Sequence, residues 1–264
     1  MTYELTLTDL AAMKQRQEKI TCLTAYDASF ARLIDQAGID IILVGDSLGP
    51  VIQGQSSTVP VTLSDVVYHC QCVRRGCHRA WLIADLPFLS YVTADQAFAA
   101  AALLMQQAGA RMIKLEGAHD ELIAQLVAHG VPVCAHLGLL PQQVHQLGGY
   151  RVQGRKADAR HRLLNDAKTV QAAGASLLVL ECVPSELAAE ITTMLDIPVI
   201  GIGAGSACDG QVLVLYDILG LSPHPPARFT HNFLAGQTSI SGAIEAFRDA
   251  VKQHHYPTSE HSYR

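Results

Sequence analysis

The stretch Ile41-Ile-Leu-Val-Gly-Asp-Ser-Leu-Gly49 runs four apolar residues into a glycine, a carboxylate and a hydroxyl. A continuous Ile/Leu/Val run of this length predicts a strand buried on both faces, as in a parallel sheet. Asp46 would stand at the carboxyl end of that strand, where a carboxylate is costly to desolvate unless it is paired or bound to a metal. Open α/β sheets and (β/α)₈ barrels place their chemistry at this end of the strands.

The same design recurs along the chain. Four further apolar runs end on an ionisable side chain, and these are Leu82–Asp85, Met112–Glu116, Val133–His136 and Leu178–Glu181. One such ending is expected by chance, whereas five indicate a ring of strand ends around a single site.

The whole chain alternates apolar runs with helical patterns, among them a helix predicted over residues 94–107. Strands are predicted over residues 20–26, 39–46, 79–85, 110–116, 131–137, 175–181, 197–203 and 211–216. Glycines stand just before four of them, at positions 38, 109, 130 and 174, as expected where a helix ends before a strand. With no linker composition in the chain, we predict one (β/α)₈ (TIM) barrel domain over residues 1–264. A helix within residues 7–19 would close its bottom, and residues 254–261 would form a frayed tail.

Composition narrows the functional class. The chain has 264 residues, and 19 basic against 24 acidic side chains give a net charge of −5. The charge offers no basic footprint for nucleic acid, and no 18-residue apolar span predicts a membrane helix. The N-terminus lacks the pattern of a signal peptide, and the seven cysteines are expected to be free thiols. We therefore expect a cytoplasmic protein with no membrane or nucleic-acid partner.

Three carboxylates end neighbouring strands, namely Asp46, Asp85 and Glu116. They would converge at the barrel mouth, where like charges repel unless a cation neutralises them. A hard divalent ion with oxygen ligands, best Mg²⁺, meets that need. The alternative is that one or two of them cap helices or pair with arginine.

Three more ionisable residues are candidates for the same site. Lys114 lies two residues before Glu116 on one strand and points to the same face, which suits an anionic substrate such as a 2-oxo acid. A structural salt bridge is the alternative for this pair. Glu181 ends a mostly apolar strand, so its pKa should be raised and it could act as a general base, or instead cap the next helix. His136 could be a metal ligand, although a hydrogen-bonding role is commoner for such a histidine.

Two other motifs are weak. Gly201–Gly205 lacks the third glycine and the context of a dinucleotide-binding loop. Cys70 and Cys72, with three neighbouring Cys and His residues, fit no common zinc-finger spacing. A helix would also place these residues on different faces.

An ordered set of motifs resembles the ketopantoate hydroxymethyltransferase (3-methyl-2-oxobutanoate hydroxymethyltransferase) family almost end to end. The motifs are Thr24-Ala-Tyr-Asp27, Leu43-Val-Gly-Asp-Ser-Leu-Gly49, Ala84-Asp-Leu-Pro-Phe88, Lys114-Leu-Glu-Gly117, His136-Leu-Gly-Leu139 with Pro141-Gln142, Gly148-Gly-Tyr-Arg-Val-Gln-Gly154, Leu178-Val-Leu-Glu-Cys-Val-Pro184, and Ile197-Pro-Val-Ile-Gly-Ile-Gly-Ala-Gly205 with Asp209-Gly210. The chain departs mildly over residues 206–208 and 223–226, and the second departure could alter the folate end of the site.

The resemblance implies a barrel related to the phosphoenolpyruvate mutase and isocitrate lyase group, and a cytoplasmic homo-oligomer, commonly a decamer. It implies transfer of a hydroxymethyl group from 5,10-methylenetetrahydrofolate to 3-methyl-2-oxobutanoate in pantothenate biosynthesis. By position, the implied roles are a Mg²⁺ site at Asp46, Asp85 and Glu116, substrate contacts at Asp46, Ser47, Asp85 and Lys114, a proton acceptor at Glu181, and an active-site position of uncertain role at His136.

Two other functions stay open on the sequence. A Mg²⁺-dependent aldolase or lyase of the same barrel group would use the same metal and lysine on a different 2-oxo acid, without folate. A catalytically silent barrel that binds an anion or a partner protein would leave five buried ionisable strand ends without a purpose.

Overall fold

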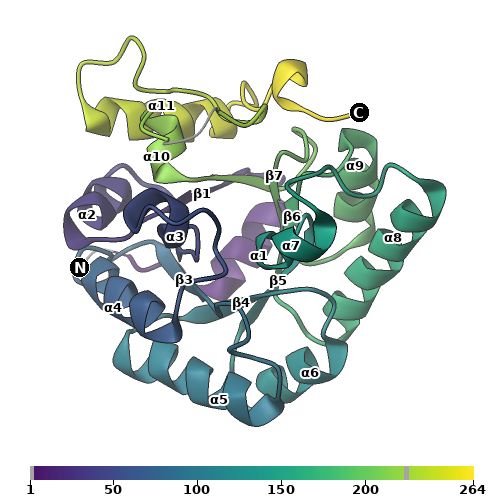
Figure 1. Cartoon of the computed structure of the whole chain (residues 1–264). Coiled ribbons are helices and arrows are strands. Elements are labelled where there is room, and N and C mark those ends of the chain that lie inside the picture. The colour runs from purple at the N-terminus through teal and green to yellow at the C-terminus, as the bar shows by residue number, and fades with distance from the viewer. Residues whose placement is uncertain (1–2, 223–225) are drawn as a thin grey trace.

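Eight parallel strands close into a barrel in sequence order, β1 to β8, which confirms the predicted fold class (Figure 1). The computed structural model describes residues 3–222 and 226–264, so most of the variable stretch at 223–226 lies outside the described residues. The strands are β1 (Ile20–Thr24), β2 (Ile41–Val44), β3 (Trp81–Asp85), β4 (Met112–Glu116), β5 (Val133–Gly138), β6 (Leu177–Glu181), β7 (Val199–Ile202) and β8 (Gly210–Leu213).

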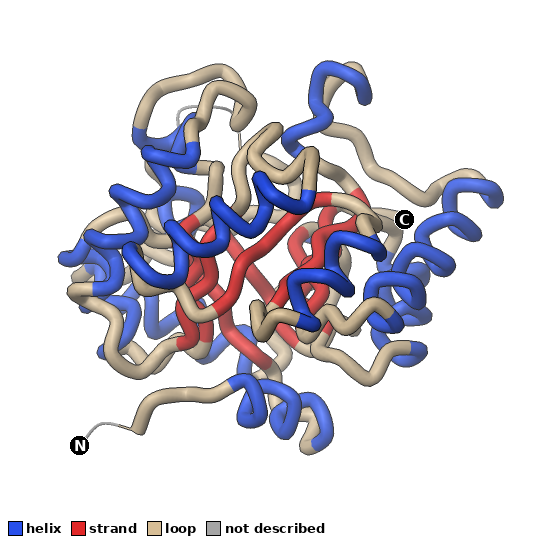
Figure 2. Tube along the Cα trace, turned by 90° about the horizontal axis from the view of Figure 1, so that it is seen from below, coloured by secondary structure: helices blue, strands red, loops and turns tan. Residues whose placement is uncertain are grey.

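Helices surround the barrel and one closes its lower end. The short helix α1 (Leu7–Gln15) lies across the end of the barrel where the strands begin (Figure 2), as predicted, and buries Leu10 and Met13 there. The remaining helices are α2 (Ala28–Gln36), α3 (Leu48–Ile52), α4 (Leu63–Arg74), α5 (Ala94–Ala102), η1 (Leu103–Gln107), α6 (Asp120–Ala128), η2 (Pro141–Gln143), α7 (Val144–Leu147), α8 (Ala157–Ala172), α9 (Ser185–Met194), α10 (Leu215–Ile218), α11 (Ile240–Lys252) and η3 (Ser259–His261).

The alternation of side chains along the strands separates two apolar cores. One lies inside the barrel, where residues such as Ile41, Ile83 and Met112 pack above α1. The other lies between the strands and the surrounding helices, and includes Ile42 and Leu82. Because both faces of each strand are buried, the strands are mostly apolar up to their carboxyl ends, as is typical of parallel sheets.

Strand register brings the ionisable strand ends to one level. Asp85 is paired with Lys114 across β3 and β4, and Glu116 with His136 across β4 and β5. Glu181 stands opposite Gly138 across β5 and β6. The closed barrel therefore places these side chains around one mouth.

Three predicted elements differ in detail. The eighth strand covers Gly210–Leu213 and turns into α10, whereas a strand to residue 216 was expected. The helix predicted over 94–107 ends in the π-helical turn η1. The prediction of a frayed tail at 254–261 is wrong, because Tyr256 is buried and Tyr263 forms a bridge with Pro184. Figure 1 shows this C-terminal segment lying beside α11 at one edge of the barrel mouth.

Gly138 shows how tightly the mouth is built. Its φ is +94°, and a Cβ added there would lie 2.2 Å from the carbonyl oxygen of Glu181. Both the backbone conformation and the close approach of β6 therefore require glycine. Gly130 has a similar φ of +81°, but an added Cβ would meet nothing within 4 Å.

The pair gives a matched test. Gly130→Ala should lower the free energy of unfolding by about 1–2 kcal/mol, the cost of the left-handed backbone conformation alone. Gly138→Ala should cost clearly more, because β6 must also move. Urea unfolding followed by circular dichroism measures both, and equal costs would contradict the argument from strand packing.

Candidate active site

The barrel mouth holds a cavity of about 160 Å³. It is lined by every site residue that the sequence predicted, that is, by Asp46, Ser47, Asp85, Lys114, Glu116, His136 and Glu181. They come from the ends of β2 to β6, and all but Ser47 and Glu181 are fully buried. The structure therefore brings together the residues that the strand ends predicted.

Lys114 is the ammonium of the site. Its Nζ lies 2.6 Å from Oδ1 of Asp85, so its ion-pair partner is the neighbouring strand's carboxylate rather than Glu116. Burial opposes the charge, yet Asp85, Asp46 and Glu116 outweigh it and raise the pKa of Lys114 above its usual range. The other oxygen of Asp85 accepts the backbone N–H of Asp46 at 3.0 Å. This network fixes Asp85 at the centre of the mouth.

Asp46 and Glu116 are held by one residue, Gln142. The Gln142 side-chain amide donates to Oδ2 of Asp46 at 2.9 Å, and its backbone N–H donates to Oε2 of Glu116 at 3.0 Å. Burial, then the charge of Asp85, raises the pKa of Asp46 to about 7. Burial, then the charge of Asp46, raises the pKa of Glu116 well above its usual range. Both carboxyls therefore tend to hold protons when no cation is near.

His136 lies between two carboxylates. Its Nε2 is 3.2 Å from Oε2 of Glu181, and its Nδ1 is 3.6 Å from Oε1 of Glu116. Neither ring nitrogen has a hydrogen-bond partner among the described residues, nor does Oε1 of Glu116. Burial, and then the charge of Lys114, lowers the pKa of His136 well below its usual range, so the ring is neutral.

Glu181 is the carboxylate nearest to open space, with 14% of its side chain exposed. Burial raises its pKa to about 8, although Lys114 opposes the shift. The alternative of a helix cap does not hold, because α9 begins at Ser185 after the cap residue Pro184, which makes no side-chain cap bond. Glu181 is thus a basic carboxylate directed into the cavity.

The donor set fits a divalent cation held by oxygen. Five carboxylates, those of Asp46, Asp85, Glu116, Glu181 and Asp217, line the cavity with one ammonium, and a buried oxygen of Glu116 has no partner among the described residues. Within residues 3–222 and 226–264, no group of three or more acidic, histidine or cysteine side chains is already arranged around one metal position. The fit is therefore to an ion that takes one or two carboxylates and completes its shell with water and substrate, as Mg²⁺ does.

Three residues of the site were not predicted from the sequence. Tyr26 contacts Ser47 through a hydroxyl–hydroxyl bond of 2.8 Å, and Tyr91 donates to Oε1 of Gln142 at 2.7 Å. Gln142 itself lay in the Pro141-Gln142 motif, but a lone glutamine in a loop carries no chemical signal. Only the folded chain shows that this loop returns to the strand ends.

Gln142→Leu tests this support. The change removes the bonds to Asp46 and Tyr91 while the backbone bond to Glu116 can remain. We expect kcat/KM to fall about 10- to 100-fold, the usual effect of losing a partner that orients a metal-binding carboxylate. Mg²⁺ titration by calorimetry should show weaker binding as well. Gln143→Leu, at the next position, is the control, and equal behaviour of the two variants would refute the role.

Comparison with known proteins identifies the fold and the family of this chain. Solved structures share the barrel at low identity, so they show the fold alone. Phosphonopyruvate hydrolase, in a complex with oxalate and Mg²⁺, has a TM-score of 0.63 at 14% identity and covers 96% of this chain and 98% of its own. The 2,3-dimethylmalate lyase, a phosphoenolpyruvate mutase/isocitrate lyase superfamily member, has a TM-score of 0.58 at 17% identity, over 81% of this chain and 82% of its own.

Relatives at high identity are more informative. The 3-methyl-2-oxobutanoate hydroxymethyltransferase of Nitrosococcus oceani is 56% identical over 261 residues, 98% of this chain and 99% of the relative. That of Methylococcus capsulatus is 55% identical over 265 residues, 100% of this chain and 98% of the relative. The family described as ketopantoate hydroxymethyltransferase matches residues 4–259. The chain therefore belongs to the ketopantoate hydroxymethyltransferase family.

Proposed function

We propose that this protein transfers a hydroxymethyl group from 5,10-methylenetetrahydrofolate to 3-methyl-2-oxobutanoate and forms 2-dehydropantoate, in pantothenate biosynthesis. The observation that carries the proposal is the cavity of about 160 Å³, lined by five carboxylates and one ammonium, in a chain of this family. The cavity is suited to a small organic acid rather than to a larger ligand.

Asp46 and Asp85 would hold Mg²⁺, with Glu116 acting through a water molecule. When bound, the ion supplies positive charge to the carboxylate and keto oxygens of the substrate and so acidifies C3. Lys114 adds a second positive charge beside the same oxygens, held in place by its ion pair with Asp85. Ser47, placed by Tyr26, would donate a hydrogen bond to the substrate.

Glu181 would remove the C3 proton. It faces the cavity, and its raised pKa makes it a stronger base than an ordinary glutamate once it is ionised. His136, neutral and with Nε2 3.2 Å from Oε2 of Glu181, would lie beside that carboxylate without adding a charge.

The overall step balances as follows. The C3–H bond breaks and a C3–CH₂ bond forms, while both C–N bonds of the folate methylene bridge break. Water supplies the hydroxyl oxygen and keeps one of its protons on it. Its second proton and the C3 proton end on N5 and N10 of tetrahydrofolate.

The cellular compartment and the oligomeric state are part of the same proposal. All seven cysteines are free, which suits the cytoplasm that the sequence predicts. Among the described residues, no helix is long and apolar enough to span a bilayer. A homo-oligomer, and a decamer in particular, stays a prediction from the family resemblance.

A Mg²⁺-dependent aldolase or lyase acting on another 2-oxo acid is the second candidate, since solved lyases share the fold. It would use the inner cavity in the same way. It would not need the larger chamber beside that cavity, which leaves room for a second substrate. Product formation that depends on methylenetetrahydrofolate separates the two functions.

Glu181→Gln tests the base. In D₂O with Mg²⁺, NMR should show the wild-type protein exchanging the C3 proton of 3-methyl-2-oxobutanoate. The variant should exchange at least about 100-fold more slowly, the usual contribution of a general base, while still binding Mg²⁺. Glu186→Gln, an exposed position on α9, is the control. Full exchange by Glu181→Gln would refute the assignment.

The exchange rate should also depend on pH. Because the ionised form of Glu181 is the active one, kcat/KM for exchange should rise with pH, with a midpoint at or below about pH 8. Bound Mg²⁺ adds positive charge, so more Mg²⁺ should move the midpoint to lower pH. A rate that falls as pH rises from 6 to 8 would contradict a carboxylate base.

A further inference from the structure

A second chamber of about 990 Å³ adjoins the inner cavity and shares part of its wall. Ser47 and Glu181 line both spaces. Its volume is near the upper end of small-molecule sites, whereas the inner cavity is smaller than such sites usually are. The chamber therefore has room for a ligand much larger than a keto acid, beside the same catalytic carboxylate.

We propose that this chamber binds the reduced folate through two groups at different positions. Asp217 would bind the 2-amino-4-oxopyrimidine edge of the pterin, and Arg151 and Arg155 would bind the glutamyl carboxylates. The inference rests on the proposed function and adds the location of the one-carbon donor.

Asp217 is the acidic group that the transfer mechanism leaves without a role. It lines both the chamber and the inner cavity, and its carboxylate accepts a hydrogen bond from Ser222. Within the described part of the chain it forms no ion pair, and burial raises its pKa. The pterin edge presents two adjacent N–H donors, which match the two oxygens of a carboxylate and would stabilise its ionised form.

The basic end of the chamber lies in the loop before α8. Arg151 and Arg155 line the chamber, and both side chains are exposed. Neither forms an ion pair among the described residues, while Arg155 Nε donates to the carbonyl of Arg264 at 3.2 Å. Two exposed guanidinium groups at the rim, of which that of Arg155 is bonded through Nε, suit the two carboxylates of a glutamyl tail.

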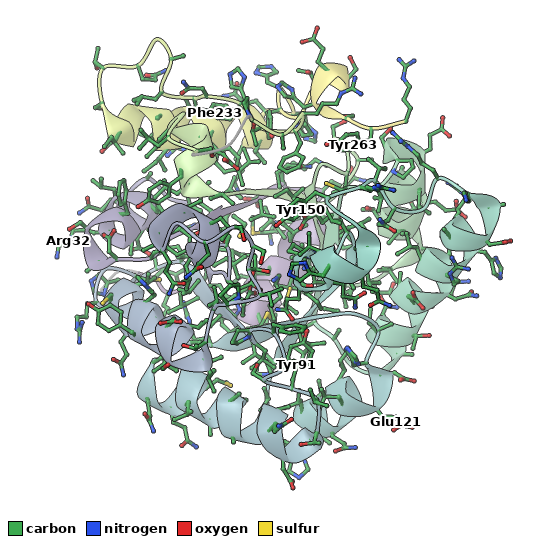
Figure 3. All side chains as sticks on the ribbon, viewed as in Figure 1. Arg32, Tyr91, Glu121, Tyr150, Phe233 and Tyr263 are labelled. Atoms are coloured by element: carbon green, nitrogen blue, oxygen red, sulfur yellow. The ribbon has the colours of Figure 1, made fainter. Side chains whose placement is uncertain are left out.

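Aromatic side chains form part of the chamber wall and offer flat apolar surfaces. Tyr150, Phe229 and Tyr263 line the chamber, and Tyr150 leaves 57% of its surface exposed. Figure 3 shows Tyr150 over the barrel mouth, with Tyr263 on the side of the C-terminal segment. The backbone N–H of Ser185 donates to the carbonyl of Tyr263, so this wall is fixed to α9. Such rings provide faces on which a pterin or aminobenzoyl group can stack.

The experiment measures binding of two probes by calorimetry, tetrahydrofolate and 6-methyltetrahydropterin, which has the ring but no tail. Asp217→Asn should raise the Kd of both probes about tenfold or more. The double variant Arg151→Ala/Arg155→Ala should raise the Kd of tetrahydrofolate by a similar factor and leave that of the pterin within about twofold. Arg162→Ala, exposed on α8 outside the chamber, is the control.

In steady-state assays, the KM for methylenetetrahydrofolate should rise relative to the KM for the keto acid in the same variants. Tetrahydrofolate should also slow amide exchange of the wild-type protein around residues 150–155 and 214–222, which needs no variant to fold. Unchanged Kd values in both variants, or no protection of these segments, would overturn the assignment. A wild-type protein that exchanges C3 protons but performs no folate-dependent transfer would instead refute the proposed function.

Discussion

The site depends on an excess of buried negative charge. Five carboxylates line a small cavity at the barrel mouth, and Lys114 is the ammonium that offsets part of their charge. Without a cation, burial and mutual repulsion raise the pKa of Asp46 to about 7 and that of Glu181 to about 8. Such an arrangement destabilises the folded state at neutral pH, because the unfolded chain would release protons that the folded chain retains. The divalent ion and acidic substrate proposed above would offset this cost.

The barrel makes this charge density possible. Successive parallel strands end at one level, so residues far apart in sequence lie around one opening. This arrangement requires close backbone contact, as at Gly138, where β5 and β6 leave no room for a Cβ. The loops that follow the strands then supply the supporting groups, with Gln142 bridging Asp46 and Glu116. A rigid frame and polar supports together hold like charges at fixed positions.

The mouth is divided into two spaces with different chemistry. The inner one is small and highly charged, and the outer one is large, with aromatic walls and two exposed arginines. Glu181 lines both, so in the proposed function it would stand between a carbon acid in the first space and a one-carbon donor in the second. The C-terminal segment, expected to be frayed, forms part of the outer wall through Tyr263.

The sequence by itself determined the strands, their number, and the ionisable residues at their ends. A continuous apolar run followed by Asp46, Asp85, Glu116 or Glu181 indicates that the carboxylate is compensated, because it stands next to a buried strand, but it leaves the compensating group open. Only the tertiary structure decided the partners. It paired Lys114 with Asp85, brought Gln142 back to the strand ends, and packed Tyr256 and Tyr263 against the barrel. Those contacts join residues that are distant in sequence. Hydrophobic periodicity and local propensity give no information about the distances between such residues, because these distances are set only when the barrel closes.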